Sequence, residues 1–232
     1  MDISVVICAK NEARGIKEVI DSCKPHCQEV IVVDGHSKDN TREIATANGA
    51  VVYLDHGKGK GDGIRTGILK AKGEIIVFMD ADLSHESKDI PNLVKPIVEH
   101  DFDVVVGSRK LGGSDELHGS LSEFIRLMGS GIITLAINYR FGIRLTDTQN
   151  GFRAIRTAVA LKLGLKEDIF TIEQEMIMKA LKKGFRITEI PSHEYKRKYG
   201  NSRIIVSKVA HRYVWTLIRY IISLLPIIPI FD

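Results

Sequence analysis

Two aspartates stand directly behind a strongly apolar run of the sequence. Asp80 and Asp82 follow the residues Ile75-Ile76-Val77-Phe78-Met79. Side chains at positions i and i+2 of an extended segment point to the same side, so the two carboxylates can meet at one place. Hard oxygen ligands of this kind suit Mg²⁺ or Mn²⁺ bridging a diphosphate. The pair therefore predicts a divalent-cation site, and a pair of helix-capping carboxylates is the structural alternative.

A glycine-rich segment that carries lysines precedes this pair. Residues 57–63 read GKGKGDG, which contains neither G-x-G-x-x-G nor G-K-S/T. The spacing excludes a dinucleotide-binding fingerprint and a P-loop. Flexible backbone beside Lys58, Lys60 and Arg65 suits an anionic ligand instead, and a solvated basic loop is the alternative.

Apolar, β-branched runs alternate with helical patterns from the start of the chain to Gly107. Runs such as Val30-Ile31-Val32-Val33 are apolar throughout, which is typical of strands buried on both faces of a parallel sheet. The pattern predicts an α/β fold in which ligands bind at the carboxyl ends of the strands. Behind Gly107 we expect a polar loop over 108–119 and a long helix over 121–139. The expected strands span 3–8, 29–34, 50–53, 74–79 and 103–106, and the expected helices 12–23, 39–48, 63–72 and 89–99.

The composition is that of a globular protein. A chain of 232 residues with 44% hydrophobic and 27% charged residues is typical of one folded domain, not of a disordered or polytopic membrane protein. Three cysteines do not make a disulfide framework and no basic leader precedes the first strand, so we expect a cytoplasmic protein. The formal net charge is +4, yet residues 193–219 carry seven Lys or Arg and one Glu. The C-terminal end is therefore a basic segment on a nearly neutral body.

The last residues of the chain are almost wholly apolar over 221–231, and they follow Arg212, Trp215 and Arg219. A spanning helix needs about 20 apolar residues, and prolines interrupt this run, so it is too short to cross a membrane. Basic residues attract anionic lipid and aromatic residues favour the headgroup level, so we predict a segment that lies in the membrane interface. A helix packed on the body or on a partner protein is the alternative. We expect a catalytic domain over 1–210 and the membrane-interface segment over 211–232.

Six short motifs occur in order along the chain: SVVICAKNE at 4–12, VDGHSKDNT at 33–41, GKG at 59–61, DAD at 80–82, GSR at 107–109 and DTQNGFR at 147–153. Together they resemble the motifs of family 2 glycosyltransferases of the GT-A fold, in particular the branch of dolichol-phosphate mannose synthases and polyprenyl-phosphate glycosyltransferases. The resemblance covers residues 3–210 and implies a mostly parallel central sheet flanked by helices. The last motif and the basic tail favour the polyprenyl-phosphate branch over chain-forming synthases.

By this resemblance, one group of residues binds the donor nucleotide and its diphosphate. The family commonly has Asp-Asp-Gly-Ser where this chain has Asp34-Gly35-His36-Ser37, so the second carboxylate is missing here. Asp80 and Asp82 are implied to hold Mg²⁺ or Mn²⁺, with Ser84 as a third ligand where the family often has a glutamine. The implied donor site comprises Ala9, Asn11, Glu12, Asp34, Asp39, Lys60, Asp80, Arg197, Ser202 and Arg203.

The acceptor site follows from the resemblance and from the charge of the substrate. A polyprenyl monophosphate is already anionic at neutral pH, so its oxygen needs no general base. Two anionic substrates instead need cations between them, and the candidates for the acceptor phosphate are Arg109, Arg126 and Arg153. Glu173 and Glu175 open an expected helix, where acids favour the helix dipole, and a functional role of these two acids is the alternative. The residues implied at the reaction centre are Asp82, Asp147, Gln149, Arg109 and Arg126.

These observations predict an inverting, metal-dependent glycosyltransferase. It would move a hexose from a nucleoside diphosphate to a polyprenyl phosphate, dolichyl or undecaprenyl, at the cytosolic face of a membrane. Mannose from GDP-mannose is the first expectation, and glucose or an N-acetylhexosamine from a UDP donor is the alternative. Whether a membrane-spanning partner protein supplies an anchor stays open.

Two further alternatives belong to other classes of protein. A non-catalytic nucleic-acid-binding module could use the basic C-terminal segment, but it leaves Asp80, Asp82 and the run 147–153 unexplained. We therefore expect no nucleic-acid partner. A GT-A fold that has lost its activity is the third alternative.

Overall fold

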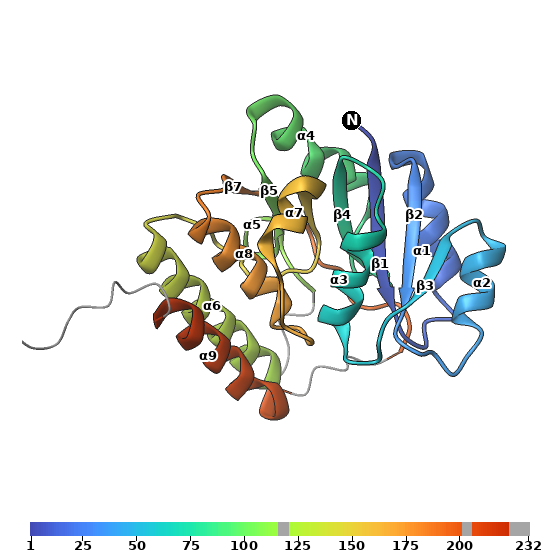
Figure 1. Cartoon of the computed structure of the whole chain (residues 1–232). Coiled ribbons are helices and arrows are strands. Elements are labelled where there is room, and N and C mark those ends of the chain that lie inside the picture. The colour runs from blue at the N-terminus through green and yellow to red at the C-terminus, as the bar shows by residue number, and fades with distance from the viewer. Residues whose placement is uncertain (116–120, 201–205, 223–232) are drawn as a thin grey trace, which may run out of the picture.

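A seven-stranded sheet runs through the centre of the molecule, with helices on both of its faces (Figure 1). The computed structural model describes residues 1–115, 121–200 and 206–222. The strand order is β3-β2-β1-β4-β6-β5-β7, and only β6 pairs antiparallel to its neighbours. The strands are β1 (Ile3–Ala9), β2 (Glu29–Asp34), β3 (Val51–Leu54), β4 (Ile75–Asp80), β5 (Val104–Ser108), β6 (Arg153–Arg156) and β7 (Ile187–Pro191). The predicted α/β class with a mostly parallel sheet is confirmed.

The helices alternate with the strands through the first half of the chain, and in the second half α7 and α8 cover one face of the sheet. They are α1 (Ile16–Cys23), α2 (Thr41–Ala47), α3 (Lys60–Lys70), α4 (Ile90–His100), α5 (Arg109–Gly112), α6 (Leu121–Phe141), α7 (Thr157–Leu163), α8 (Ile172–Lys182) and α9 (Val206–Ile222), with 3₁₀ turns at Lys24–His26 and Ser87–Asp89.

The apolar runs bury both faces of the sheet, as their composition predicts. Val5 and Ile7 of β1 pack into one cluster with α1, α2 and α4, whereas Val6 packs into a second cluster with α3, α7 and α8. β1 lies between β2 and β4, with Cys8 opposite both Val33 and Asp80. The carboxyl ends of these three strands therefore meet at one edge of the sheet.

The antiparallel strand β6 is the main feature that the sequence pattern does not predict. It has only four residues, and it inserts between β4 and β5, with Val77 and Val105 both opposite Ala154. Because it runs against its neighbours, the residues that precede it lie at the carboxyl ends of β4 and β5. The motif at 147–153 is thereby brought to the same edge as the two aspartates of β4 and its following turn.

Some predicted boundaries differ from the observed ones. The first helix begins at Ile16 and not at residue 12, because residues 13–15 form a turn. α3 begins at Lys60 and not at residue 63, so the glycine-rich segment enters the helix. Gly59 before it has a φ of 128°, a conformation that glycine adopts readily. The loop predicted over 108–119 contains α5 and a parallel bridge between Ser114 and Glu194.

α6 and α9 lie side by side beyond the edge of the sheet (Figure 1). α9 packs on the body through Tyr213, Leu217 and Tyr220, and the amide of Gln174 in α8 donates to the carbonyl of Tyr213 at 2.9 Å. The domain boundary predicted at residue 210 falls inside this helix, and residues 223–232 of the predicted tail lie outside the described residues. Over the described ranges, none of the helices combines the length and the apolar character needed to cross a bilayer.

Gly67→Ala should destabilise the fold although alanine favours helices. A Cβ atom at Gly67 would lie 2.3 Å from Cγ1 of the buried Val6, so α3 would have to move away from β1. We expect the free energy of unfolding to fall by about 1–3 kcal/mol. Denaturant unfolding followed by circular dichroism measures the change.

Gly129→Ala in α6 is the matched control for Gly67→Ala. Nothing lies within 4 Å of a Cβ atom at Gly129, so better helix propensity should leave stability unchanged or raise it by up to about 1 kcal/mol. Equal effects of the two substitutions would contradict the close packing of α3 on β1.

Candidate functional site

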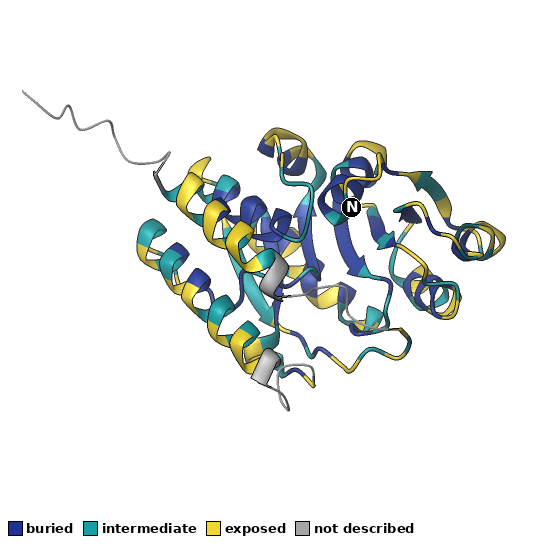
Figure 2. Cartoon of the chain, turned by 90° about the horizontal axis from the view of Figure 1, so that it is seen from below, coloured by how far each residue is buried: buried dark blue, intermediate teal, exposed yellow. Residues whose placement is uncertain are grey.

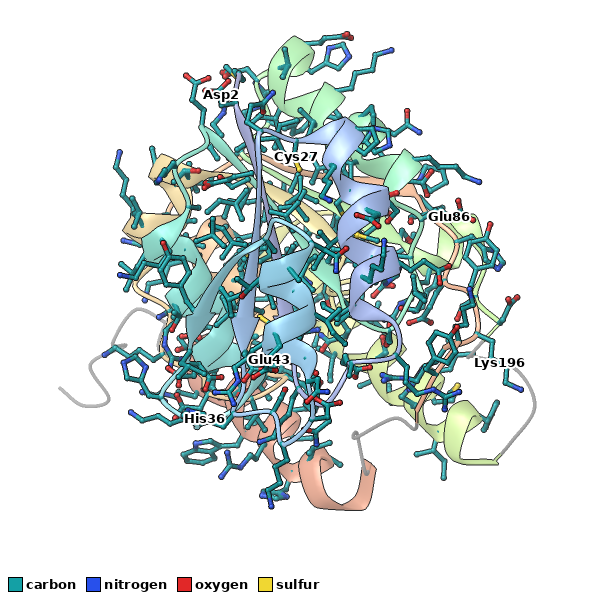
Figure 3. The ribbon with its side chains drawn as sticks, turned by 90° about the vertical axis from the view of Figure 1, so that its right-hand side faces the viewer. Asp2, Cys27, His36, Glu43, Glu86 and Lys196 are labelled. Atoms are coloured by element: carbon teal, nitrogen blue, oxygen red, sulfur yellow. The ribbon has the colours of Figure 1, made fainter. Side chains whose placement is uncertain are left out.

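The polar residues that follow the strands gather at one edge of the sheet. In Figure 3, Asp2 and Cys27 precede β1 and β2 at one end of the strands, and His36 follows β2 at the other end. At that second end lies a cavity of about 830 Å³. Residues of β1, β2, β4, α3, α5, α6, α8 and α9 and of the loops between them line this cavity. The predicted site residues in its lining are Ala9, Glu12, Lys60, Asp80, Asp82, Ser84, Arg109, Arg126, Gln149 and Arg197.

Lys60, the first residue of α3, is the central cation of the polar end of the cavity. Its Nζ lies 2.6 Å from Oδ1 of Asp80 and 3.0 Å from Oε1 of Glu173. Burial by itself lowers the pKa of Lys60, but the two carboxylates outweigh burial and raise that pKa above its ordinary value. Burial likewise raises the pKa of Asp80, but Lys60 outweighs it and holds that pKa below its usual range. Both partners therefore stay charged at neutral pH.

Asp82 is held by the segment that follows β7. Its Oδ2 lies 2.7 Å from Nη2 of Arg197, and its Oδ1 accepts a hydrogen bond from the hydroxyl of Ser84 at 2.6 Å. The backbones of the two segments are also joined, because the amide of Tyr195 donates to the carbonyl of Ser84 at 2.8 Å. Arg197 additionally reaches Oε1 of Glu12 at 3.4 Å. The predicted donor-site residues Glu12 and Arg197 are thus brought together with the predicted metal ligand Asp82.

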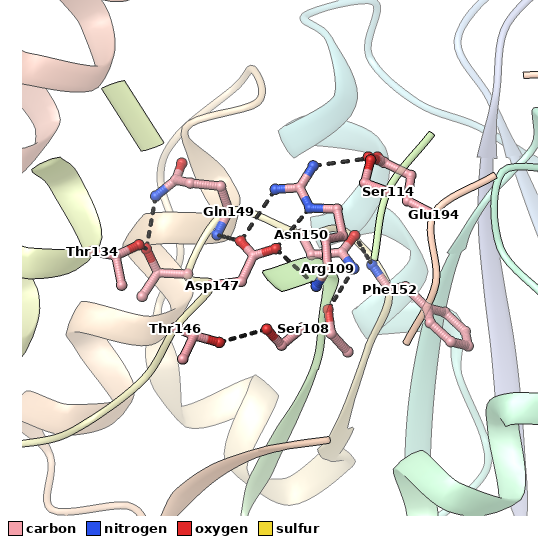
Figure 4. A network of polar contacts seen from close by, with 12 residues as sticks. Ser108, Arg109, Ser114, Thr134, Thr146, Asp147, Gln149, Asn150, Phe152 and Glu194 are labelled. Carbon is pink, nitrogen blue, oxygen red and sulfur yellow. Dashed lines mark hydrogen bonds and ion pairs between the residues drawn. The ribbon is translucent and has the colours of Figure 1, made fainter. Parts of the chain in front are cut away.

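Arg109 lines the cavity and contacts the carboxylates of Asp147 and Glu194 (Figure 4). Glu194 also lines the cavity, whereas the predicted site residue Asp147 is buried behind Arg109 and does not. Its Nε and Nη2 donate to the two oxygens of Asp147 at 2.7 and 3.1 Å, and its Nη1 donates to Glu194 at 3.3 Å. A guanidinium has five N–H donors, so these contacts leave two for a ligand in the cavity. Burial lowers the pKa of Arg109, but the two carboxylates outweigh burial and raise it. Burial also raises the pKa of Asp147, and Arg109 outweighs it and holds that pKa low.

The predicted run 147–153 divides between the cavity and the core. Gln149 lines the cavity, and within the described part of the chain its buried Oε1 has no hydrogen-bond partner. Asn150 ties the run to β5, since its Nδ2 donates to the carbonyl of Gly107 at 2.5 Å. Arg153 is 1% exposed and lies outside the cavity lining, where its Nε and Nη1 donate to the carbonyls of Asn150 and Glu173 at 3.0 and 2.9 Å. Backbone carbonyls thus hold Arg153 inside the sheet, in a structural position and not in the predicted acceptor site.

Three residues predicted around the nucleotide hold turns and do not line the cavity. Asp34 is fully buried, and both of its oxygens accept hydrogen bonds from Ser37. Asp39 and Asn11 accept from backbone N–H groups of neighbouring turns at 3.2 and 2.7 Å. These contacts shape the turn behind β1, which carries the lining residue Glu12 next to Ala9 at the end of the strand. Ser202 and Arg203 lie outside the described residues.

The cavity also uses residues that the sequence analysis does not assign to it. These residues are Asp55, which follows β3, Phe170 and Glu173 at the start of α8, Glu194, which follows β7, and Tyr213 of α9. Asp55 follows a strand just as Asp80 ends one, so its position in the sequence already indicates a residue at the edge of the sheet. The other four come from regions where the strand and helix alternation has stopped, so no periodic pattern pointed to them.

The carboxylates of Asp80 and Asp82 fit a divalent cation that takes further ligands from a diphosphate. A Cβ atom at Gly151 would lie 3.1 Å from Oδ2 of Asp80, so the glycine keeps that side of the carboxylate open to the cavity. Within 1–115, 121–200 and 206–222, no three His, Cys, Asp or Glu side chains form a metal cluster of their own. Mg²⁺ is commonly bound by one or two carboxylates together with substrate phosphates. Ser84 donates to Asp82, so its role in this structure is to orient that carboxylate.

The sequence is similar to known glycosyltransferases. The family model described as glycosyl transferase family 2 matches residues 4–168. The UDP-N-acetylglucosamine–dolichyl-phosphate N-acetylglucosaminyltransferase of Methanococcus voltae is 30% identical over 240 residues, which cover 90% of this chain and 94% of the relative. The glycosyltransferase AglJ of Haloferax volcanii is 32% identical over 193 residues, covering 82% of this chain and 62% of the relative. An uncharacterized protein of Methanocaldococcus jannaschii, MJ1222, is 33% identical, covering 87% and 85% of the two chains.

Solved structures share the fold. Glucosyl-3-phosphoglycerate synthase of Mycobacterium tuberculosis, in complex with Mn²⁺, UDP and glucosyl-3-phosphoglycerate, superposes with a TM-score of 0.74 at 22% identity. The match covers 94% of this chain and 79% of that one. The same enzyme with Mg²⁺ and UDP gives a TM-score of 0.75 at 21% identity, with the same coverage. This likeness confirms the predicted GT-A fold.

Asp147→Asn should destabilise the protein because it leaves the buried guanidinium of Arg109 beside a neutral partner. Breaking a buried ion pair of this kind lowers the free energy of unfolding by about 3–5 kcal/mol. The introduced asparagine can still accept a hydrogen bond from Arg109, so we expect a loss near the lower of these two values. The folded pKa of Asp147 is lowered, so its stabilisation is fully present above about pH 4 and is lost as the pH falls through the folded pKa. The variant should therefore lose less stability on acidification than the wild type does. Urea unfolding at several pH values measures both effects.

Asp101→Asn is the control for Asp147→Asn. Asp101 is exposed and lies 3.0 Å from Arg156, so its replacement should change the free energy of unfolding by less than about 1 kcal/mol. If Asp147→Asn were as mild as Asp101→Asn, the buried pair would not be the stabilising contact described here.

Proposed function

This chain belongs to glycosyl transferase family 2, and from that membership we propose that it transfers a hexose, with inversion, from a nucleoside diphosphate to a polyprenyl phosphate at a membrane surface. The observation that carries the proposal is a cavity with two different ends. Charged side chains line it at the edge of the sheet, and apolar side chains line it between α6 and α9. A nucleotide sugar is polar along its length, whereas a polyprenyl phosphate joins an anionic head to an apolar chain. The cavity offers a matching environment to each substrate.

The apolar end of the cavity is built by two neighbouring helices. Ile125, Ile132 and Ile133 reach it from α6, and Val214 and Leu217 reach it from α9. Three of these, Ile125, Ile132 and Val214, are also exposed to solvent, so the apolar lining continues onto the outer surface. An isoprenoid chain that enters along this surface brings its phosphate toward the polar end.

Arg109 and Arg126, both in the cavity lining, are proposed to hold the acceptor phosphate. An oxygen of that phosphate attacks the anomeric carbon of the donor sugar from the side opposite the diphosphate. The new carbon–oxygen bond forms as the bond to the diphosphate breaks, and the nucleoside diphosphate leaves with the electron pair. The anomeric configuration is inverted. No general base takes part, because the attacking oxygen is already anionic.

The opposite wall of the cavity is proposed to serve the departing diphosphate. A Mg²⁺ or Mn²⁺ ion held by Asp80 and Asp82 would neutralise the charge that develops there. Lys60 and Arg197 already contact those carboxylates at 2.6 and 2.7 Å, so two further positive charges lie within reach of the same phosphates. The segment of Arg197 is tied to Ser84, which keeps the guanidinium over the site and limits the access of water.

Two donors are consistent with this site. GDP-mannose is the expectation from the sequence motifs. The Methanococcus voltae relative is named for UDP-N-acetylglucosamine and dolichyl phosphate, which supports a UDP-linked donor and a dolichyl acceptor. Gly35, which stands where the family commonly has a second aspartate, lines the cavity, so the nucleotide site has one carboxylate fewer than the common motif supplies.

The outer face of α6 and α9 is proposed to lie against the membrane. Figure 2 shows exposed positions along both helices. Amphipathic helices with aromatic and basic residues bind the headgroup region, and the exposed Arg212 and Arg219 suit anionic lipid. A nucleic-acid-binding module would have no use for an apolar surface of this kind. The exposed apolar residues are Phe124, Ile125, Met128, Ile132, Leu135, Tyr139, Val214, Trp215 and Ile218.

Asp80→Asn and Asp82→Asn should each lower the rate of sugar transfer by about 100-fold or more, because the charge that stabilises the leaving diphosphate is lost. Transfer is measured as radioactivity moved from GDP-mannose, UDP-glucose or UDP-N-acetylglucosamine into a polyprenyl phosphate, with Mn²⁺ present. The wild type should label the lipid from one donor and lose that activity when EDTA is added.

Asp21→Asn, at an exposed ion pair with Lys17, is the control and should keep wild-type transfer. Failure of the wild type to label the lipid from any of the three donors would contradict the proposed function. Full activity in both Asp80→Asn and Asp82→Asn would place the leaving-group site elsewhere.

The single tryptophan of the chain, Trp215, reports on membrane contact. It is 65% exposed, so vesicles that contain anionic lipid should shift its emission to the blue and raise its intensity. The double variant Leu135→Glu with Ile218→Glu should bind such vesicles at least about 10-fold more weakly, since two apolar side chains leave the interface and two negative charges enter it.

Leu69→Glu is the matched control for vesicle binding. Leu69 is an exposed leucine of α3, so the Leu69→Glu variant should bind vesicles as the wild type does. If the double variant and this control sedimented with vesicles to the same extent, the face of α6 and α9 would not be the membrane contact.

A further inference from the structure

Glu173, the second residue of α8, has an oxygen that none of the described residues hydrogen-bonds. Its side chain is among the buried ones, 3% exposed, yet it lies in the lining of the cavity. Oε1 faces Nζ of Lys60 at 3.0 Å, whereas Oε2 has no hydrogen-bond partner within the described part of the chain. A buried carboxylate oxygen without a partner is costly, so such an atom at a cavity wall indicates a donor that arrives with a ligand.

The position of Glu173 indicates which part of a bound ligand this side chain would contact. The same ammonium nitrogen of Lys60 contacts Glu173 and Asp80, so the two carboxylates are separated by the width of one cation. Asp80 is proposed to serve the donor diphosphate. The hexose is bonded directly to that diphosphate, so a carboxylate one cation away from Asp80 lies within reach of the sugar.

The backbone at Gly151 keeps this place open. A Cβ atom there would lie 2.8 Å from Nζ of Lys60 and 3.1 Å from Oδ2 of Asp80. A larger residue would therefore fill the space in front of the lysine and the two acids that it joins. Glycine leaves that space to a ligand, and Phe170 adds an aromatic wall, with its ring centre 5.7 Å from the same Nζ.

Glu175, two residues further along the same helix, is a glutamate with a structural role and allows a comparison with Glu173. It is buried like Glu173, but its oxygens accept from the backbone N–H groups of Lys166 and Glu167 at 2.8 to 2.9 Å, and it also contacts Lys179 and Tyr220. It does not line the cavity. The two glutamates thus differ in whether the protein itself satisfies them.

We propose that Oε2 of Glu173 accepts a hydrogen bond from a hydroxyl group of the transferred hexose, and that Glu173 thereby helps to select the donor sugar. This inference rests on the proposed function, because it needs a nucleoside-diphosphate sugar in the cavity. A site built to bond a sugar hydroxyl discriminates strongly against a sugar that lacks it, since the buried oxygen is then left without a donor.

The test compares the binding of a nucleotide sugar with that of its bare nucleotide, which separates the sugar contact from the diphosphate contacts. Calorimetry in the presence of Mn²⁺ gives the dissociation constants of UDP and UDP-N-acetylglucosamine, and of GDP and GDP-mannose. Glu173→Gln should weaken binding of the preferred nucleotide sugar by about 10- to 100-fold, the range of a hydrogen bond to a charged group, and leave its bare nucleotide within about 3-fold.

Glu175→Gln is the matched control on the same helix. It should lower the thermal unfolding temperature without changing the ratio of the two dissociation constants. A second comparison uses the 3-, 4- and 6-deoxy forms of UDP-N-acetylglucosamine and GDP-mannose. One of these should bind the wild type weakly, and Glu173→Gln should bind that same form no more weakly than the wild type does.

The outcomes separate the two proposals. Equal weakening of bare nucleotide and nucleotide sugar in Glu173→Gln would show that Glu173 only positions Lys60, and would overturn the sugar contact while keeping the proposed function. Unchanged binding of both ligands would overturn the contact as well. A wild-type protein that binds none of the nucleotide sugars would overturn the proposed function itself.

Discussion

The pairing of buried acids with cations at the carboxyl edge of the sheet is the constraint on which the site depends. A carboxylate removed from water is tolerated only when a counter-charge and hydrogen bonds replace its hydration. Here each counter-charge comes from a distant part of the chain, so the edge can form only when those parts have docked. The pairs are Lys60 of α3 with Asp80, Arg109 of α5 with Asp147, and Arg197 behind β7 with Asp82.

The same pairs explain how the site can accept two charged groups at once. On the proposed function, the donor brings a diphosphate together with a divalent cation. The carboxylates of Asp80 and Asp82 can bind the cation while Lys60 and Arg197 pair with the phosphates, so that every buried charge keeps a partner of opposite sign. A diphosphate without the cation, or a cation without the diphosphate, would leave one set of these partners unbalanced. The arrangement therefore favours joint binding of metal and donor over binding of either one.

Much of this architecture is visible in the sequence, and the reason is physical. Strands buried on both faces need uninterrupted apolar runs, so β1, β2 and β4 could be predicted within two residues of their observed ends. β6 could not, because four residues with an arginine at each end do not form a recognisable apolar run. The direction of that strand decides where the motif 147–153 goes. It also explains why Arg153, which looks like a cavity arginine in the sequence, is held by backbone carbonyls inside the sheet.

Individual site residues were harder to predict than the strands because spacing does not report burial. Glu173 and Glu175 both stand in the first turn of α8, where either would favour the helix dipole. Only packing distinguishes them, because one faces the cavity and the other accepts backbone hydrogen bonds. In the same way, Asp34 and Asp80 both end apolar strands, but the turn after β2 folds back so that Ser37 occupies both oxygens of Asp34. A polar residue at a strand end is thus a candidate for the cavity only when the following turn leaves it free.

α8 connects the polar end of the cavity to the helix α9, which lines its apolar end. Glu173 faces the cavity, while the next two residues, Gln174 and Glu175, hold α9 through Tyr213 and Tyr220. α9 in turn packs Leu217 against the body and exposes Trp215. The packed helix and the proposed membrane-interface helix would therefore use opposite faces of one helix. On the proposed function, with that helix on the membrane, an isoprenoid chain can stay in the lipid while its phosphate reaches the sugar, so the acceptor never has to be extracted into water.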